Sequence, residues 1–206
     1  MNEALVLKKT DFEETSVIIN VITEKGYESL MLKGAKRKNS LKLALTEPLT
    51  KIAYTKGKGE NMALLYEGEV VDNYQDIKSD LDRLSIASVV LDYAVSIRGS
   101  LISYDKLYSL IIDTLKSIEI ESDPEFYLFR FEIALSSLLG ISPRKSYLLD
   151  EYKATPSLIE SIEAVLKGED IKDRLELRNF FIEYYFHELD IKLKSKKLYL
   201  SIIKEA

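Results

Sequence analysis

Four basic residues lie close together in the segment Leu32–Ser40, whose sequence is LKGAKRKNS. They are Lys33, Lys36, Arg37 and Lys38. Cationic side chains bind phosphate oxygens, and each phosphate that they neutralise releases counterions, so the affinity depends on salt and little on base sequence. Glycine and alanine in the segment let the backbone approach a ligand closely. Asn39 and Ser40 add neutral donors for phosphate, and the segment therefore predicts contacts with a nucleic-acid backbone.

The charge of the chain is unevenly distributed. Residues 33–58 hold eight basic residues and one acidic residue, a net charge of +7, so the rest carries −12 of the total of −5. A polyanion responds to the field within roughly 8–10 Å, which makes this local charge more informative than the acidic total. A basic loop is plain solvated surface about as often as it is a binding site, but here further lysines follow on a second turn. We predict phosphate contacts by Lys33, Lys36, Arg37, Lys38, Lys42, Lys56 and Lys58.

Three tyrosines lie on or beside predicted strands and could stack on bases. They are Tyr27, Tyr54 and Tyr66. Aromatic residues on strands more often belong to the core, and this is the favoured interpretation for each of the three.

The residues that most enzymes use are scarce. His187 is the only histidine and the chain has no cysteine, so the usual general bases, thiolate nucleophiles and zinc ligand sets are missing. His187 follows Phe186 in a helical stretch, which favours a packed or surface imidazole. The acidic residues Glu119, Glu121 and Asp123 could bind a hard cation, although a solvated link between helices is the favoured interpretation.

The turn Gly57-Lys58-Gly59 superficially resembles a phosphate loop. A nucleotide-binding P-loop needs two glycines four residues apart, then lysine and a hydroxyl residue opening a helix, and strand-like sequence follows here instead. We therefore expect a hairpin tip and no enzyme, no metal ion and no cofactor.

The elements that must position these residues change character near residue 76. Apolar and β-branched runs separated by glycine-containing turns predict five short strands in about 70 residues, which suggests a small closed barrel of the size of an oligonucleotide-binding (OB) fold, although other small barrels have it too. The runs are Ala4–Leu7, Val17–Ile22, Leu30–Leu32, Leu49–Tyr54 and Met62–Tyr66 continuing through Gly68–Val71.

Helical periodicity and capping signals follow. A capping box at Ser79–Asp82 and the pairs Asp123-Pro124 and Thr155-Pro156 predict helix starts, and Gly99, Gly140 and Gly168 predict helix ends. A single long helix is expected from Ile171 to about Ile203. The fold class is thus α+β, with an OB-fold barrel over residues 1–78 and an all-α domain over residues 79–206.

A second basic cluster lies near the end of the chain. Its members are Lys192, Lys194, Lys196 and Lys197. Cations near a helix C-terminus are stabilised by the helix dipole by about 0.3–1 kcal/mol each, so a structural explanation is strong and contact with DNA stays open.

The first residues lack the pattern of a signal peptide, and no apolar run of about 18 residues is present. With the absence of cysteine, this leads us to expect a cytoplasmic, nucleoid-associated protein without membrane contact.

The order of these features resembles the RecO family of bacterial recombination mediators almost from end to end. The family's opening strand and turn, its lysine-glycine-alanine-arginine segment, its central helix motif and its closing lysine-serine-arginine stretch all have counterparts. These are Glu3–Lys8, Asp11–Ser16, Leu32–Arg37, Pro48 at the next strand, Arg130–Glu132 followed by Leu138–Ile141, and Lys194–Leu198.

The resemblance implies a non-enzymatic mediator that binds single- and double-stranded DNA. Such proteins anneal strands coated by single-stranded-DNA-binding protein (SSB) and act with RecR to help load RecA. The resemblance also implies that Arg130 binds the acidic, apolar tail of SSB. A salt bridge within the helical domain is an equal alternative for this residue.

One large feature of many family members is missing. Their four-cysteine zinc module would fall in residues 142–172, where this chain has no cysteine and a short helix is expected. The zinc module is therefore predicted to be absent. The alternative to DNA binding is an OB-fold scaffold that binds protein partners such as RecR or SSB, with lysines that serve only solubility.

Overall fold

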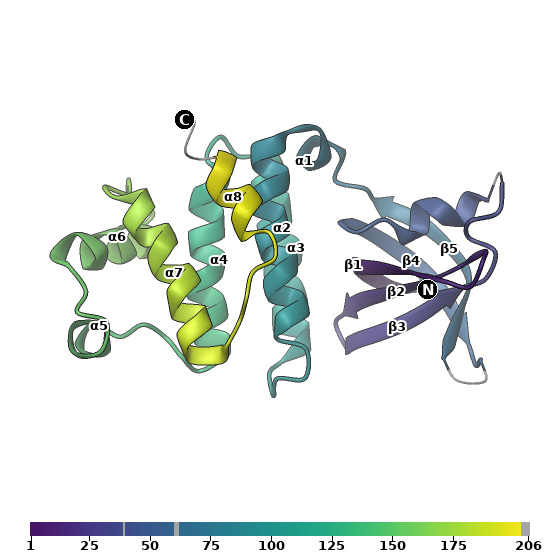
Figure 1. The fold of residues 1–206 in the computed structure, drawn as a ribbon, viewed down its shortest axis with the longest axis horizontal. Coiled ribbons are helices and arrows are strands. Elements are labelled where there is room, and N and C mark those ends of the chain that lie inside the picture. Colours follow the sequence, from purple (N-terminus) through teal and green to yellow (C-terminus); the bar gives the residue numbers. More distant parts are fainter. Residues whose placement is uncertain (39, 60–61, 203–206) are drawn as a thin grey trace. The chain divides into compact units, whose positions relative to one another are not determined.

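A computed structural model describes residues 1–38, 40–59 and 62–202 of the chain. Strands occupy the first third and helices the remainder, which confirms the predicted α+β class (Figure 1). Contacts divide the molecule into two compact units, residues 1–79 with 104–109 and residues 80–103 with 110–206. Asn39, expected to donate to phosphate, lies outside the described residues.

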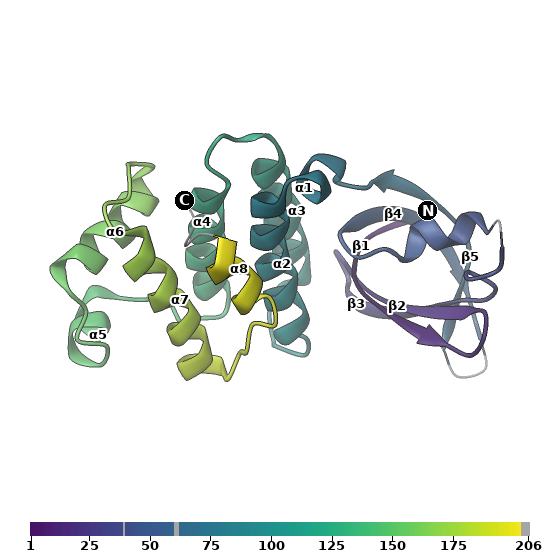
Figure 2. The ribbon, with the colours of Figure 1, turned by 45° about the horizontal axis from the view of Figure 1, so that its top comes forward.

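The described residues of the first unit form a closed five-stranded barrel (Figure 2). The strands are β1 (Asn2–Phe12), β2 (Ser16–Thr23), β3 (Gly26–Leu32), β4 (Thr50–Gly57) and β5 (Ala63–Asp72). Their order around the barrel is β1-β2-β3-β5-β4, and β3 pairs with β5 in parallel through Leu30↔Ala63 and Met31↔Leu64. A short 3-10 helix, η1 (Leu41–Thr46), connects β3 to β4. Five strands closed in this way form the predicted OB-fold barrel.

Alternation along the strands separates the barrel core from its surface. On β2, Val17, Ile19 and Val21 are buried in the core, and their β-branched side chains suit a pleated surface. On β3, Leu30 and Leu32 fill the same core. The residues between these, Ile18 and Asn20 on β2 and Met31 on β3, point to the outer face of the two strands.

The second unit consists of helices whose starts follow local capping. The helices along the chain are α1 (Gln75–Ser79, in the first unit), α2 (Leu81–Ser96), α3 (Tyr104–Ile120), α4 (Pro124–Leu138), α5 (Lys145–Asp150), α6 (Pro156–Lys167), α7 (Arg174–Leu189) and α8 (Lys196–Ile202). Asp123 and Thr155 cap α4 and α6 as predicted. The capping box expected at Ser79 is wrong, because Asp80 accepts from the backbone N–H of Arg83 and is the true N-cap.

The single long helix predicted from Ile171 to about Ile203 is also wrong. The chain leaves α7 at Asp190, which adopts the left-handed conformation with φ of 53°. Ser195 then donates its backbone N–H and its hydroxyl to Asp92 Oδ2, at 2.7 and 2.8 Å. A carboxylate from α2 thus starts α8, and such a tertiary contact leaves no periodic signal in the sequence. Ile203 lies outside the described range.

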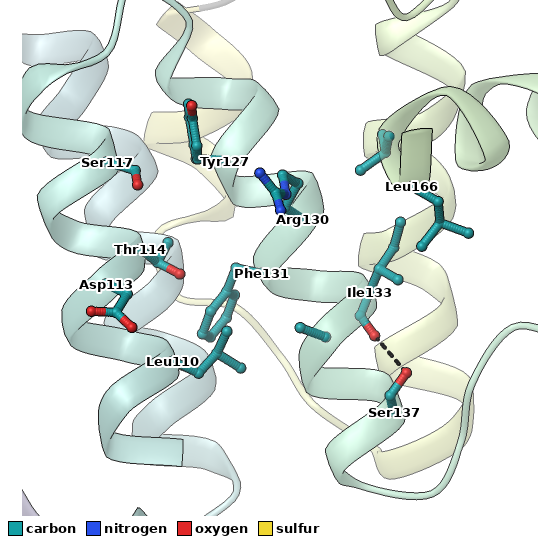
Figure 3. A pocket seen from close by; sticks show the side chains of 12 residues that line it. Leu110, Asp113, Thr114, Ser117, Tyr127, Arg130, Phe131, Ile133, Ser137 and Leu166 are labelled. Atoms are coloured by element: carbon teal, nitrogen blue, oxygen red, sulfur yellow. Dashed lines mark hydrogen bonds between the residues drawn. The ribbon is translucent and has the colours of Figure 1, made fainter. Parts of the chain in front are cut away.

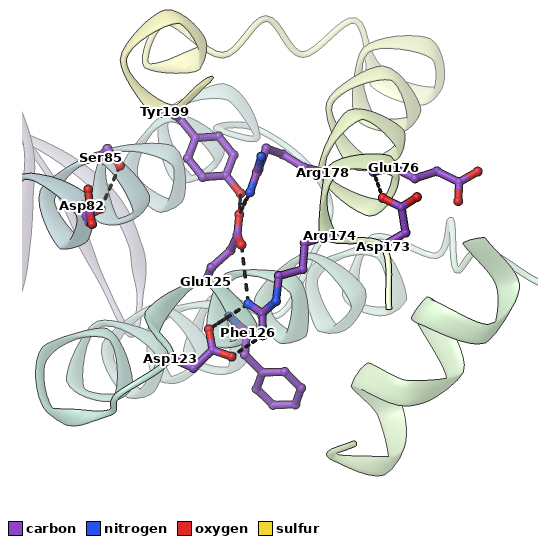
Figure 4. A network of polar contacts seen from close by, with 10 residues as sticks. All are labelled: Asp82, Ser85, Asp123, Glu125, Phe126, Asp173, Arg174, Glu176, Arg178 and Tyr199. Carbon is purple, nitrogen blue, oxygen red and sulfur yellow. Dashed lines mark hydrogen bonds and ion pairs between the residues drawn. The ribbon is translucent and has the colours of Figure 1, made fainter. Parts of the chain in front are cut away.

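A buried polar network joins α4, α7 and α8 (Figure 4). Glu125 Oε1 accepts from Arg178 Nε at 2.9 Å and from the Tyr199 hydroxyl at 2.9 Å. Next to it, Arg174 donates to both carboxylate oxygens of Asp123. The Arg178 side chain is only 5% exposed, so its charge depends on Glu125 for compensation.

A second buried carboxylate lies about two helical turns further along α4. Glu132 Oε1 accepts from the Tyr93 hydroxyl at 2.8 Å, and its Oε2 has no hydrogen-bond partner within the described part of the chain. Burial raises the pKa of the Glu132 carboxyl well above its ordinary value, more than the Tyr93 hydrogen bond lowers it. The carboxyl therefore stays protonated at pH values where exposed glutamates are charged.

We predict that Arg178→Ala destabilises the helical unit by about 3–5 kcal/mol, because Glu125 is left as a buried charge without its partner. Urea unfolding followed by circular dichroism at 222 nm measures the effect. Lys172→Ala is the matched control, since Lys172 pairs with Glu160 on the surface with 75% and 56% of the side chains exposed. Equal stability of the two variants would contradict the role given to the network.

Stability is also predicted to fall as the pH rises above the ordinary glutamate pKa of 4.5, because the folded state holds the Glu132 proton longer than the unfolded state does. Glu132→Gln removes this slope between pH 5 and 8. The pKa values of Asp123 and Glu188 are lowered, so these two carboxyls change the stability only below that pH window. Free energies of unfolding measured in steps of half a pH unit test this, and parallel profiles for both proteins would refute it.

Candidate nucleic-acid interface

The basic loop after β3 is fixed to the barrel by backbone and core contacts. The backbone N–H of Lys36 donates to the carbonyl of Thr15 at 2.9 Å, which ties the loop to the turn between β1 and β2. Ala35 is fully buried in the barrel core. These contacts leave Lys33, Arg37 and Lys38 exposed on a loop whose position is set by the fold.

Gly34 allows this conformation. Its φ is +70°, in the left-handed region that favours glycine, and an added Cβ would lie 3.3 Å from Cδ and Nε of Arg37. The Arg37 stem therefore packs across Gly34. The sequence Gly34-Ala35 in the basic segment is thus explained by backbone geometry and core packing.

The basic residues of the loop differ in their partners. Lys36 Nζ lies 3.4 Å from Asp11 Oδ2 and 3.3 Å from the carbonyl oxygen of Glu13, so its charge is partly matched. Among the residues that the structure describes, Lys33, Arg37 and Lys38 make no ion pair. These three are the cations that the fold leaves for a ligand.

The structure places the other predicted cations at separate positions. Lys42 is half-buried in η1, directly after the loop. Lys56 Nζ lies 2.5 Å from Glu28 Oε2, an oxygen that also accepts from the Tyr54 hydroxyl at 3.1 Å. Lys58 is exposed on the turn between β4 and β5. Lys56 thus reaches Glu28, the third residue of β3. The turn that carries Lys58 lies beside the later part of β3, because Gly57 is opposite Leu64 and Leu64 is opposite Met31.

A neutral surface lies next to the basic loop, on two neighbouring strands. On the outer face of β2 and β3, Ile18 is opposite Met31 and Asn20 is opposite Ser29, all half-buried. The Ser29 hydroxyl donates to Asn20 Oδ1 at 2.7 Å. The face of strands 2 and 3 is the one that OB folds use for oligonucleotides. The sequence analysis missed these four residues, although the alternation along the two strands would have identified them.

The three tyrosines lie in different environments. Tyr54 is fully buried in the core, as favoured for strand aromatics, and Tyr27 is half-buried. Tyr66 on β5 is 54% exposed and its ring covers Gly57, where an added Cβ would lie 2.0 Å from Cε2. Tyr66 therefore presents an aromatic face beside the turn that carries Lys58.

The helical unit contains a groove between α3, α4 and α6 (Figure 3). Its volume is about 440 Å³, and its walls are largely apolar, formed by Leu110, Phe131, Ile133, Ala134, Val165 and Leu166. Arg130 lines it, is exposed, and lies over the Tyr127 ring at 6.0 Å from the centroid. No ion pair of Arg130 occurs in the described ranges, so the salt bridge considered for it is not formed there.

The motif Arg130-Phe131-Glu132 has a simple geometric basis. Successive residues of a helix point about 100° apart. Arg130 consequently faces the groove, Phe131 forms its floor and is 1% exposed, and Glu132 points into the buried core. One short motif serves both the surface and the interior.

The other residues considered for chemistry have structural partners. His187 is 72% exposed on the last turn of α7, with Nδ1 3.2 Å from the Tyr152 hydroxyl. Asp123 caps α4 and binds Arg174, which explains it without a cation. No group of three side chains suited to holding a metal ion occurs among residues 1–38, 40–59 and 62–202. Over the same residues, no helix combines the length and apolar character needed to cross a membrane.

A family model and several individual proteins that are similar to this chain all belong to one family. A family model described as "Recombination protein O N terminal" matches residues 1–74. The DNA repair protein RecO of Halalkalibacterium halodurans is 28% identical over 142 residues, which are 68% of this chain and 56% of that protein. RecO of Thermoanaerobacter is 29% identical over 145 residues, 69% of this chain and 58% of that protein. RecO of Bacillus subtilis is 25% identical over 146 residues, with 70% and 57% covered. The match thus spans somewhat more than half the length of these relatives.

Proposed function

Because this chain belongs to the RecO family, we propose that it acts in recombinational DNA repair as a non-enzymatic mediator that binds single- and double-stranded DNA through its barrel. In this proposal it anneals SSB-coated strands and, with RecR, helps to load RecA. Its place of action is the cytoplasm, at the nucleoid.

One observation carries the proposal. Lys33, Arg37 and Lys38 are exposed and make no ion pair in the described part of the chain, on a loop held in place by Ala35 and by the Lys36 backbone. Unpaired cations at fixed positions bind phosphate without first breaking internal contacts. Phosphates occur in both single and double strands, which accounts for binding to both.

The remaining predicted cations have different roles in this proposal. Lys36 and Lys56 already contact Asp11 and Glu28, so binding phosphate competes with an internal carboxylate. Lys58 is exposed near Tyr66, and together they contact the DNA strand beside the turn between β4 and β5. Bases in a single strand lie over the face of Ile18, Asn20, Ser29 and Met31.

The combined variant Lys33→Gln, Arg37→Gln and Lys38→Gln is expected to lower affinity for a single-stranded oligonucleotide more than tenfold at low salt. The slope of log affinity against log salt should fall by about 2, at about 0.7 per lost phosphate contact. Fluorescence anisotropy between 50 and 200 mM salt measures both quantities.

The matched control is Lys145→Gln, Lys167→Gln and Lys172→Gln, which removes three exposed lysines that lie beside Glu163 or Glu160. Its affinity and slope should equal those of the unmodified protein. If the barrel variant also binds with unchanged affinity and slope, the barrel is not the DNA site.

The groove at Arg130 supports the second part of the proposal, binding of the SSB tail. Arg130, which has no ion pair in the described ranges, and the apolar walls suit a peptide that is acidic and apolar, whereas Asp113 on the α3 side of the groove repels a carboxylate. We expect Arg130→Ala to weaken binding of such a peptide about tenfold or more, since a charged hydrogen bond contributes about 1.5–3 kcal/mol. Isothermal titration calorimetry measures this, with Arg144→Ala, an exposed arginine away from the groove, as control. Equal losses in both variants, or none in either, would reject the groove as the peptide site.

A second candidate function rests on a different observation. Leu41 is 93% and Leu43 47% exposed on η1, beside the basic loop, and exposed leucines are typical of protein interfaces. On this alternative the barrel is a scaffold for a partner such as RecR, without significant DNA binding. Annealing of SSB-coated complementary oligonucleotides separates the two functions, because a scaffold alone does not speed annealing.

A further inference from the structure

The four lysines near the end of the chain occupy positions where the helix dipole does not explain them. Lys196 and Lys197 lie in the first turn of α8, and Lys192 and Lys194 precede it. From the sequence, stabilisation at a helix C-terminus was a strong explanation for this cluster, and contact with DNA stayed open. The start of a helix carries partial positive charge instead, so cations there are disfavoured. The dipole of α8 therefore gives no reason for cations at Lys196 and Lys197.

The segment that carries these lysines is held in place on both sides. Ser195 is bound through its backbone N–H and its hydroxyl to Asp92 on α2. Tyr199 is 1% exposed and donates to Glu125 at 2.9 Å, with the Arg178 guanidinium 5.3 Å from its ring centroid. The lysines on either side of Ser195 are thus presented from a fixed backbone.

These lysines have few internal partners. Lys192 Nζ lies 3.4 Å from Asp190 Oδ1 and 5.4 Å from the centroid of the Phe186 ring. Lys194, Lys196 and Lys197 are exposed and form no ion pair within the ranges that the structure describes. In their exposure and their lack of an ion pair, these three lysines are like Lys33, Arg37 and Lys38 on the barrel.

A hollow of about 580 Å³ has Lys196 in its lining. Its lining consists of Glu151, Tyr152, Ile182, Glu183, Phe186, His187 and Lys196. Phe186 is 48% exposed, and aromatic side chains beside lysines are the combination that holds single-stranded nucleic acid. The two glutamates repel phosphate and accept hydrogen bonds from N–H groups of bases, such as the N3–H of thymine. A strand bound here therefore directs its bases into the hollow and its phosphates towards the lysines.

We propose that Lys194, Lys196 and Lys197, with the hollow beside Phe186, form a second site for single-stranded DNA, separate from the barrel. This inference rests on the proposed function, because it assigns the second of the two strands that an annealing protein must hold. One chain then binds two strands, one on each unit.

Native mass spectrometry with a 15-nucleotide oligothymidine at low salt tests the inference by counting strands per chain. We expect two strands on the unmodified protein and on the Lys145, Lys167 and Lys172 control. The variant Lys194→Gln, Lys196→Gln and Lys197→Gln should bind one, and so should the barrel variant. A protein carrying both sets of substitutions should bind none.

The outcomes distinguish the two proposals. Two strands on the Lys194, Lys196 and Lys197 variant, or only one on the unmodified protein, would overturn the second site. Two strands on the barrel variant would overturn the barrel site instead. A glutamate-rich peptide that binds the unmodified protein and is lost in the Lys194, Lys196 and Lys197 variant, while the strand count stays at two, would identify a protein partner and also overturn the inference.

Photocrosslinking provides an independent measurement on the folded protein. An oligonucleotide containing 5-iodouracil should crosslink to Tyr152 or Phe186, because bases in the hollow lie against these rings. The crosslink should disappear in the Lys194, Lys196 and Lys197 variant. Crosslinks confined to the barrel would count against the second site.

Discussion

Closure of the barrel by two residue pairs determines the geometry of the proposed DNA site. Leu30↔Ala63 and Met31↔Leu64 join β3 to β5 in parallel, and the other neighbours in the barrel pair antiparallel. This contact brings the start of β5, and the turn before it, alongside β3. As a result, the turn that carries Lys58 lies beside the later part of β3, the strand that leads into the basic loop. A sheet left open at this edge would separate Lys58 and Tyr66 from the basic loop.

Buried polar contacts have the corresponding role in the helical unit. Glu125 binds both Arg178 on α7 and Tyr199 on α8, and its own helix, α4, carries Arg130 on another face. The same core therefore orients the peptide groove and the lysines of α8. Removal of one partner from such a buried pair leaves an uncompensated charge, which ties the arrangement of α4, α7 and α8 to these contacts.

The sequence predicted the barrel, its strand count and most helix starts, because β-branched runs, glycine turns and caps such as Asp123 are local signals. It also identified Lys33, Arg37 and Lys38, since clustered charge is visible in the chain itself. It did not predict the break after Asp190, which depends on Asp92 more than ninety residues earlier. Nor could it show that Lys36 and Lys56 have carboxylate partners, or that Arg130 borders a groove, because those contacts come from distant segments. Residue type is local information, whereas pairing and exposure are properties of the fold.

The position of Tyr66 over Gly57 has an optical consequence. The chain has thirteen tyrosines and no tryptophan, so tyrosine fluorescence is not quenched by energy transfer to an indole ring. Six tyrosines are fully buried. The ring of Tyr66, in contrast, is half exposed to solvent beside the proposed path of the DNA strand. A base stacked on that ring would quench its emission. The unlabelled protein thus carries its own spectroscopic reporters of DNA binding, Tyr66 at the barrel and Tyr152 in the hollow of the helical unit.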